Sequence, residues 1–225
     1  MYPAGNLFIN APHGRLEAIL KEPRATDDVE TKGSGAALVL HPHPLHGGTM
    51  HNKVVFRAAG ALNDAGLTTL RINFRGVGSS TGTHDDARGE KEDASVALDY
   101  LQTHYTDDDI TLAGFSFGAR VGLEVGIADR RVRWLIGIGT PVDKYDFAFL
   151  ENCRKPILFV HGDRDEFGSA ASLRALIAKL PAEAHARLAL IEGAEHFFEG
   201  HLDELKRAIT DWTREQLEHA NASAS

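Results

Sequence analysis

Segments with the composition of buried β-strands alternate with segments of helical length along most of the chain, and this alternation constrains the fold most. Strand-like stretches are "AALVLH", "LTTLRINF", "DITLAGF", "VRWLIGIG", "PILFVHG" and "ARLALIEG". Helices are predicted between or after them, over residues 51–65, 90–104, 116–128, 169–180 and 202–219. Alternation of this kind predicts βαβ units, and therefore an α/β fold with a mostly parallel sheet and helices on both faces.

Two earlier stretches, "NLFIN" and "RLEAIL", flank "APHG" and predict an antiparallel hairpin with Gly14 in its turn. The hairpin brings the sheet to about eight strands. Residues 24–35 read as a polar loop. The length of 225 residues suits one domain, so we expect a single domain over residues 1–225, with a frayed tail at 218–225.

The composition excludes several classes of protein. A net charge of −8 disfavours a nucleic-acid surface, which needs clustered positive charge. No apolar run reaches the roughly 18 residues of a membrane span, and the N-terminus lacks the basic and apolar regions of a signal peptide. A single cysteine, Cys153, rules out an internal disulfide. We therefore expect a cytoplasmic protein.

The stretch "TLAGFSFGARVG" places one serine, Ser116, between two phenylalanines and two glycines, Gly114 and Gly118. In one interpretation the glycines relieve crowding where a strand meets a helix, and Ser116 is an ordinary N-cap. In the other, the stretch is the G-x-S-x-G nucleophile elbow, in which a sharp turn exposes the serine above a sheet. The five residues alone do not decide between these interpretations.

Candidate acid and base residues follow Ser116 in the chain. A serine hydroxyl needs a base to accept its proton, and the base needs an acid to orient it. Asp163 and Asp165 follow the strand "PILFVHG", and His196 follows the strand "ARLALIEG". The order Ser, Asp, His and the position of each residue at a strand's carboxyl end favour the elbow.

Several motifs resemble those of one known family. The chain contains "HPHPLHGGTMHNKVV", "INFRGVGSSTG", "AGFSFGA" and "EHFF". It resembles the α/β-hydrolases, and within them a group of small bacterial serine hydrolases that lack a lid and are related to dienelactone hydrolases. The latter use a cysteine nucleophile where this chain has Ser116. In this family the acid stands last in a G-x-x-D turn, which favours Asp165 over Asp163 and implies the triad Ser116, Asp165 and His196.

Acyl transfer also needs N–H donors for the developing oxyanion. One is expected to be the backbone N–H of Phe117, which follows the nucleophile. The other is expected in "HPHPLHGG", where Pro42 and Pro44 have no N–H; the family pattern favours His43 over Leu45. The histidines of this segment, His41, His43, His46 and His51, suggest a metal site, but a structural role for them is favoured and no metal is expected.

The segment between "LIGIG" and "PILFV" is too short for a lid domain, so we expect an open, largely apolar site. The residues expected to line it for substrate are Leu45, Val142, Tyr145, Phe147 and Phe197.

The sequence thus predicts a serine hydrolase that cleaves short-acyl carboxylic esters through an acyl-enzyme, without a cofactor. The same triad acting on thioesters, lactones or small peptides is an alternative, and a non-catalytic binding protein is a third hypothesis. The expected partner is a small ester. Neither nucleic acid nor membrane is expected as a partner, and the protein would be a monomer or a homodimer.

Overall fold

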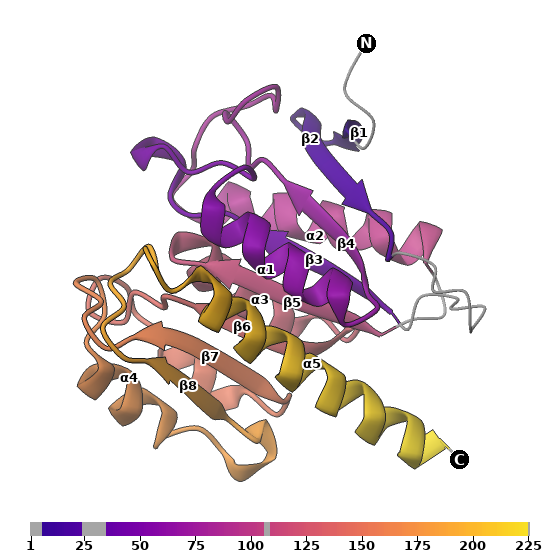
Figure 1. Cartoon of the computed structure of the whole chain (residues 1–225). Helices are drawn as coiled ribbons and strands as arrows, with labels where there is room; N and C mark the ends of the chain where they lie inside the picture. The colour runs from indigo at the N-terminus through magenta and orange to yellow at the C-terminus, as the bar shows by residue number, and fades with distance from the viewer. Residues whose placement is uncertain (1–5, 24–34, 106–108, 225) are drawn as a thin grey trace.

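An eight-stranded sheet forms the centre of the molecule (Figure 1). The computed structural model describes residues 6–23, 35–105 and 109–224, so most of the loop expected at 24–35 lies outside the described residues. The strand order is β1-β2-β4-β3-β5-β6-β7-β8. The strands are β1 (Asn6–Ala11), β2 (Gly14–Lys21), β3 (Ala36–Leu40), β4 (Thr68–Ile72), β5 (Ile110–Phe115), β6 (Val132–Ile138), β7 (Ile157–Gly162) and β8 (Arg187–Ile191).

The pairing of the strands confirms the mostly parallel sheet. β1 pairs with β2, and β2 with β4, in antiparallel fashion. All other neighbouring pairs, from β4–β3 to β7–β8, are parallel. Every residue of β3, β5 and β7 is buried, as expected for parallel strands that are covered on both faces.

Helices cover both faces of the sheet, again as predicted. α1 and α5 pack on one face in a core that includes Leu62, Phe115 and Trp212. α2, α3 and α4 pack on the other face in a core that includes Leu98, Val121 and Leu173. The helices are α1 (Lys53–Asp64), α2 (Arg88–His104), α3 (Phe117–Ala128), α4 (Ala170–Ile177) and α5 (Leu202–Ala224), and the 3-10 helices are η1 (Pro44–His46), η2 (Ala148–Asn152) and η3 (Ala182–Ala184).

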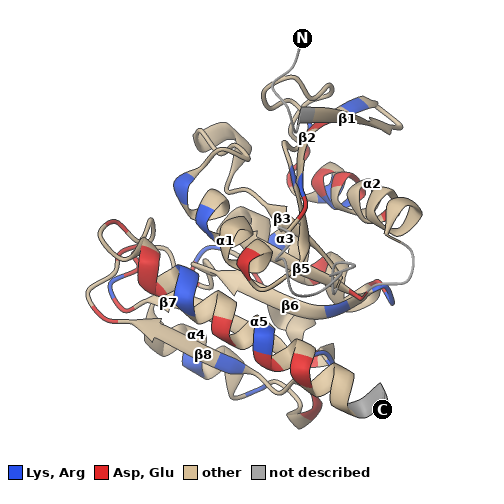
Figure 2. Ribbon diagram, turned by 45° about the vertical axis from the view of Figure 1, so that its right-hand side comes forward, with Lys and Arg blue, Asp and Glu red and all other residues tan. Residues whose placement is uncertain are grey.

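Helix α5 is longer than the sequence analysis predicts. Acidic and basic residues alternate in short groups along this helix (Figure 2), while Leu205, Ile209 and Trp212 are buried against the sheet. The tail expected to fray from residue 218 is helical to Ala224, because Leu217 and Ala220 still pack against the same core. Among the described residues, no helix combines the length and apolar composition needed to cross a bilayer.

The carboxyl ends of the parallel strands lie level with one another. Leu40 of β3 is in register with Gly114 of β5, and Phe115 with Ile138 of β6. Gly162 of β7 is likewise in register with Ile191 of β8. The loops that follow these strands therefore begin at one edge of the sheet, where α/β proteins place their reactive groups.

The connection from β6 to β7 contains only a few turns and the five-residue helix η2. This is too little chain to build a lid, as predicted. The edge of the sheet that carries the loops is thus not covered by an inserted domain.

Candidate active site

Ser116 occupies a strained turn between β5 and α3. Its backbone has φ 57° and ψ −118°, a region that residues with a Cβ rarely adopt. The turn is held because the Ser116 N–H donates to the carbonyl of Ile138 at 2.9 Å, and α3 begins at the next residue. Strain of this kind persists where the surrounding structure enforces it, and it is found most often at functional sites.

The two glycines of the stretch are required by close backbone contacts. A Cβ on Gly114 would collide with the carbonyl of Gly118. A Cβ on Gly118 would lie 2.6 Å from the carbonyl oxygens of Leu40 and His41 in the neighbouring strand and loop. The Ser116 side chain makes no capping hydrogen bond to α3, so it is not an ordinary N-cap. The glycines therefore allow a turn that leaves the serine hydroxyl free for another partner.

That partner is His196, in the loop after β8. The Nε2 atom of His196 lies 2.9 Å from Oγ of Ser116, and its Nδ1 atom lies 2.8 Å from Oδ2 of Asp165. A proton on Nδ1 donates to the carboxylate, which leaves Nε2 as the acceptor for the serine hydroxyl. Three residues from distant parts of the sequence thus form one hydrogen-bonded line.

The structure distinguishes the two candidate aspartates. Asp165 is buried, and its Oδ1 accepts the N–H groups of Phe167 at 2.8 Å and Gly168 at 3.2 Å. Asp163 is exposed, and its Oδ1 instead accepts the N–H of Gly193 at 2.7 Å. The carboxylate against His196 is therefore that of Asp165, and Asp163 ties together the turns after β7 and β8.

Aromatic rings surround the imidazole of His196. The ring centroids of Phe167, Phe115 and Phe197 lie 4.5, 5.0 and 5.2 Å from it. His196 is 2% exposed, so these rings shield its hydrogen bond to Asp165 from water. Shielding strengthens the electrostatic part of that hydrogen bond because the local dielectric constant is low.

Two backbone N–H groups near Ser116 are available to an incoming oxygen. Phe117 is the first residue of α3, and a helix leaves its first N–H groups without internal acceptors. Within the described chain, no hydrogen bond involves the N–H of Phe117 or of His43. The His43 ring packs against Phe117 with centroids 4.8 Å apart, and its Nδ1 accepts the N–H of Leu45 at 3.2 Å. These contacts fix the loop beside the elbow.

His41 has a structural role. It is fully buried; its Nε2 accepts the N–H of Phe74 at 3.0 Å, and its Nδ1 lies 2.6 Å from the carbonyl of Pro42. Burial lowers the pKa of His41 from 6.5 to about 4, so the ring is neutral and braces the loop after β3. Burial also lowers the pKa of His43. In the part of the chain that the structure describes, no group of three or more His, Cys, Asp or Glu residues is placed to hold a metal ion.

Ser116 and His196 open into a cavity of about 640 Å³, within the usual range for small-molecule sites. Of the residues expected to line it, Tyr145 and Phe197 do so. Four loops at the carboxyl edge of the sheet form its walls. The loop after β3 contributes Pro42, His43 and His46, and the loop after β6 contributes Pro141, Lys144 and Tyr145. Phe167 comes from the loop after β7, and Phe197 from the loop after β8.

Three residues expected at this cavity lie elsewhere. Leu45 projects from η1 and is 70% exposed. Val142 and Phe147 line a separate hollow of about 350 Å³ beside α4, and the Phe147 ring is buried in the core. Neighbours in sequence diverge here because the loop after β6 turns: Lys144 lines the cavity at Ser116, Val142 and Asp143 line the hollow beside α4, and Tyr145 lines both.

The sequence analysis missed His46, Lys144 and Phe167 as lining residues. Phe167 could have been found from its position two residues after Asp165, whose carboxylate accepts its N–H. Nothing in the sequence pattern singled out Lys144, and His46 was noted only as one of the histidines of its segment, with a structural role favoured.

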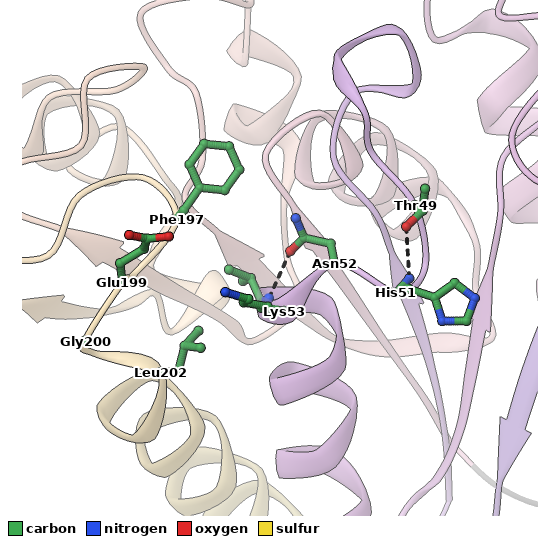
Figure 3. Close-up of a pocket in the computed structure, with 9 residues that line it drawn as sticks. Thr49, His51, Asn52, Lys53, Phe197, Glu199, Gly200 and Leu202 are labelled. Atoms are coloured by element: carbon green, nitrogen blue, oxygen red, sulfur yellow. Dashed lines mark hydrogen bonds between the residues drawn. The ribbon is translucent and has the colours of Figure 1, made fainter.

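A second hollow, of about 560 Å³, adjoins the cavity (Figure 3). The two share Asn52 and Phe197 as lining residues. Figure 3 shows Phe197 and Glu199, from the loop before α5, on one side of this hollow, and Asn52 and Lys53, at the start of α1, on the other. Phe197, which is 48% exposed, therefore stands between the two hollows.

The fold, the strained serine and the loops at the carboxyl edge of the sheet define an α/β-hydrolase. The family model described as "alpha/beta hydrolase domain" matches residues 36–223, and the chain belongs to this family.

Similar proteins support the same class. A protein of Rickettsia prowazekii is 39% identical over 213 residues, which cover 92% of this chain and 87% of the relative. A solved α/β serine hydrolase homologue from Coxiella burnetii is 38% identical with a TM-score of 0.85, covering 94% of this chain and 98% of that one. A solved α/β serine hydrolase without a lid, from Xanthomonas campestris, is 32% identical with a TM-score of 0.85, covering 96% and 97%.

Proposed function

We propose that this α/β-hydrolase cleaves carboxylic esters with short acyl groups through Ser116, His196 and Asp165. The observation that carries the proposal is the hydrogen-bonded line from Ser116 Oγ through both ring nitrogens of His196 to Asp165 Oδ2. A serine is nucleophilic only when a base accepts its proton, and this line supplies both the base and the group that orients it.

In the first step, Ser116 Oγ attacks the ester carbonyl while His196 Nε2 takes the hydroxyl proton. The carbonyl oxygen becomes an oxyanion, which the N–H groups of Phe117 and His43 stabilise. When the tetrahedral intermediate collapses, the bond to the alcohol breaks and His196 returns the proton to the leaving oxygen. Asp165 holds the correct tautomer and stabilises the imidazolium.

In the second step, water attacks the acyl-enzyme. His196 takes a proton from the water, the oxyanion forms in the same place, and Ser116 leaves with the proton that His196 returns. The products are a carboxylic acid and the free enzyme. The residues present supply every proton transfer, so the proposed reaction requires neither a metal ion nor a cofactor.

The size of the site suits an ester of small-molecule dimensions. The cavity at Ser116 is about 640 Å³ and is bounded by Tyr145, Phe167 and Phe197. An esterase domain of a Rhodothermus marinus protein shares the fold at 19% identity, so this fold accommodates ester hydrolysis. We further propose a cytoplasmic monomer or homodimer whose partner is the small ester itself.

The experiment is a substrate panel combined with active-site labelling. A fluorophosphonate probe should label Ser116 of the folded protein, and para-nitrophenyl esters should be cleaved faster as the acyl chain shortens. Faster cleavage of thioesters, lactones or aminoacyl amides would replace the ester proposal with one of those substrates. Absence of labelling would favour a non-catalytic binding protein.

A further inference from the structure

The charged groups around the cavity at Ser116 are unevenly distributed. The whole chain has 32 acidic and 24 basic side chains, not counting histidine. Yet no carboxylate is among the described residues that line this cavity, and Lys144 is there together with His43 and His46. Since burial lowers the pKa of His43, its ring is neutral at neutral pH, and the ammonium group of Lys144 is the permanent charge on the cavity wall.

Contacts place this ammonium group close to the reacting side chains. The N–H groups of Lys144 and Tyr145 both donate to the carbonyl of Pro141, at 3.0 and 3.2 Å, which closes a turn around Lys144. The Lys144 Nζ atom lies 5.8 Å from the centroid of the Phe167 ring, and that ring packs against His196. Two successive contacts thus connect the ammonium group with the imidazole that faces Ser116.

Within the part of the chain that the structure describes, no acidic side chain forms an ion pair with Lys144. The adjacent Asp143 lines the separate hollow beside α4, where its carboxylate accepts the N–H of Ser169 at 2.7 Å. That hydrogen bond, with a smaller contribution from the nearby charge of Lys144, lowers the pKa of Asp143.

The adjoining hollow gives a useful contrast. It also contains a lysine, Lys53, but the carboxylate Glu199 lines the same hollow (Figure 3). An anion that enters this hollow therefore meets both signs of charge. Among the described residues that line the cavity at Ser116, only the positive sign is present: Asp86 and Glu90 interact electrostatically with His43, and Asp86 with Tyr145, but neither carboxylate lines the cavity.

We propose that the cavity at Ser116 selects esters that carry a negatively charged group, and that Lys144 is the residue that recognises it. This inference rests on the proposed ester hydrolysis. In a cavity of this size, an anionic group of the substrate lies near the ammonium group of Lys144. The attraction between the two offsets the repulsion that the protein's net charge of −8 exerts on an anionic substrate. Lys144 would recognise either a carboxylate or a phosphate, because both are anionic oxygen groups. The charged group can belong to the acyl part or to the alcohol part of the ester.

The test compares pairs of esters in which one member has a free carboxylate and the other has the same carboxylate as its methyl ester. One pair carries the charge in the acyl part: the para-nitrophenyl monoester of adipic acid and its methyl ester. The other pair carries it in the leaving group: para-acetoxybenzoate and methyl para-acetoxybenzoate. In at least one pair, kcat/KM of the anionic member should be about fivefold higher at low salt, the size expected for a partly exposed charge pair. The preference should fall as salt is added.

Two variants locate the effect. Lys144→Met should abolish the preference for the anionic member, and Lys144→Glu should reverse it. Lys53→Met serves as the matched control, because it removes a lysine from the adjoining hollow, and it should leave the ratio unchanged. Comparable or faster cleavage of the neutral member in both pairs, or a preference that survives Lys144→Met, would overturn the inference while ester hydrolysis stands. If no ester is cleaved and Ser116 is not labelled, the proposed function itself fails.

Discussion

Asp165 holds His196 with one carboxylate oxygen while the other oxygen is fixed by its own loop. Oδ2 lies 2.8 Å from Nδ1 of His196, and Oδ1 accepts the N–H groups of Phe167 and Gly168. The carboxylate therefore cannot rotate away from the imidazole without breaking hydrogen bonds in a buried environment. The following predictions depend on this arrangement and on the strained turn beside it.

Replacing Ser116, the proposed nucleophile, should abolish activity without unfolding the protein. In Ser116→Ala, kcat should fall about 10⁴-fold or more, because the members of such a unit fail together. Steady-state kinetics and loss of fluorophosphonate labelling measure the effect. Ser95→Ala is the control, since Ser95 bonds only within α2; an equal loss in both variants would contradict the assignment.

Replacing the two aspartates should separate their roles. Asp165→Asn should lower kcat by about 10³- to 10⁴-fold, because an amide does not hold the productive tautomer of His196. Asp163→Asn should retain most activity. An amide oxygen accepts the N–H of Gly193 more weakly than a carboxylate does, so the free energy of unfolding should fall by about 1 kcal/mol at most. Kinetics and urea denaturation of both variants provide the measurement. The reverse pattern of activities would make Asp163 the acid.

Stability should fall on acidification because His41 is buried in its neutral form. Its pKa is about 4 in the folded protein against 6.5 when unfolded, so the unfolded state takes up the proton first. The free energy of unfolding should therefore fall as pH drops from 6.5 towards about 4, by about 2 kcal/mol at about pH 5. Urea denaturation at several pH values measures this dependence.

The His41 contribution can be isolated with a variant. His41→Gln should be less stable than the original protein at neutral pH, yet it should lack this part of the pH dependence. His51→Gln, at an exposed position, should keep it. An identical pH dependence in His41→Gln and the original protein would show that other groups cause the acid sensitivity.

Adding a single methyl group at the elbow should be much more harmful than adding it in a helix. Gly118→Ala would bring a Cβ to 2.6 Å from two carbonyl oxygens, and the free energy of unfolding should fall by about 2 kcal/mol or more. Gly60→Ala, in α1, meets no atom within 4 Å and should stabilise the protein by about 0.5–1 kcal/mol. Thermal and urea denaturation compare the two. Equal changes in the free energy of unfolding for the two variants would mean that the backbone at the elbow can shift to accommodate the added methyl group.

The mostly parallel sheet with helices on both faces, and the candidate residues at its edge, could be read from the sequence, whereas the order of the strands was not predicted. Strands that alternate with helices allow few topologies, because parallel connections are right-handed and need a helix to cross the sheet. A serine between glycines, an acid after β7 and a histidine after β8 then had to meet at one edge, since the carboxyl ends of parallel strands lie together. The antiparallel hairpin of β1 and β2 could also be predicted, because two strand-like stretches flank a short turn that contains Gly14.

The walls of the cavity could not be read in the same way. Tyr145 and Lys144 line it, whereas Val142 and Phe147, from the same loop, face a different hollow. The reason is physical: strands and helices repeat with fixed periods, but the direction of a loop side chain depends on each turn and on the elements packed against it. The sequence by itself therefore determined the sheet and the candidates Ser116, His196 and the aspartate pair. Tertiary structure decided which carboxylate meets His196 and which side chains surround the reacting atoms, because both depend on contacts between loops that are distant in the chain.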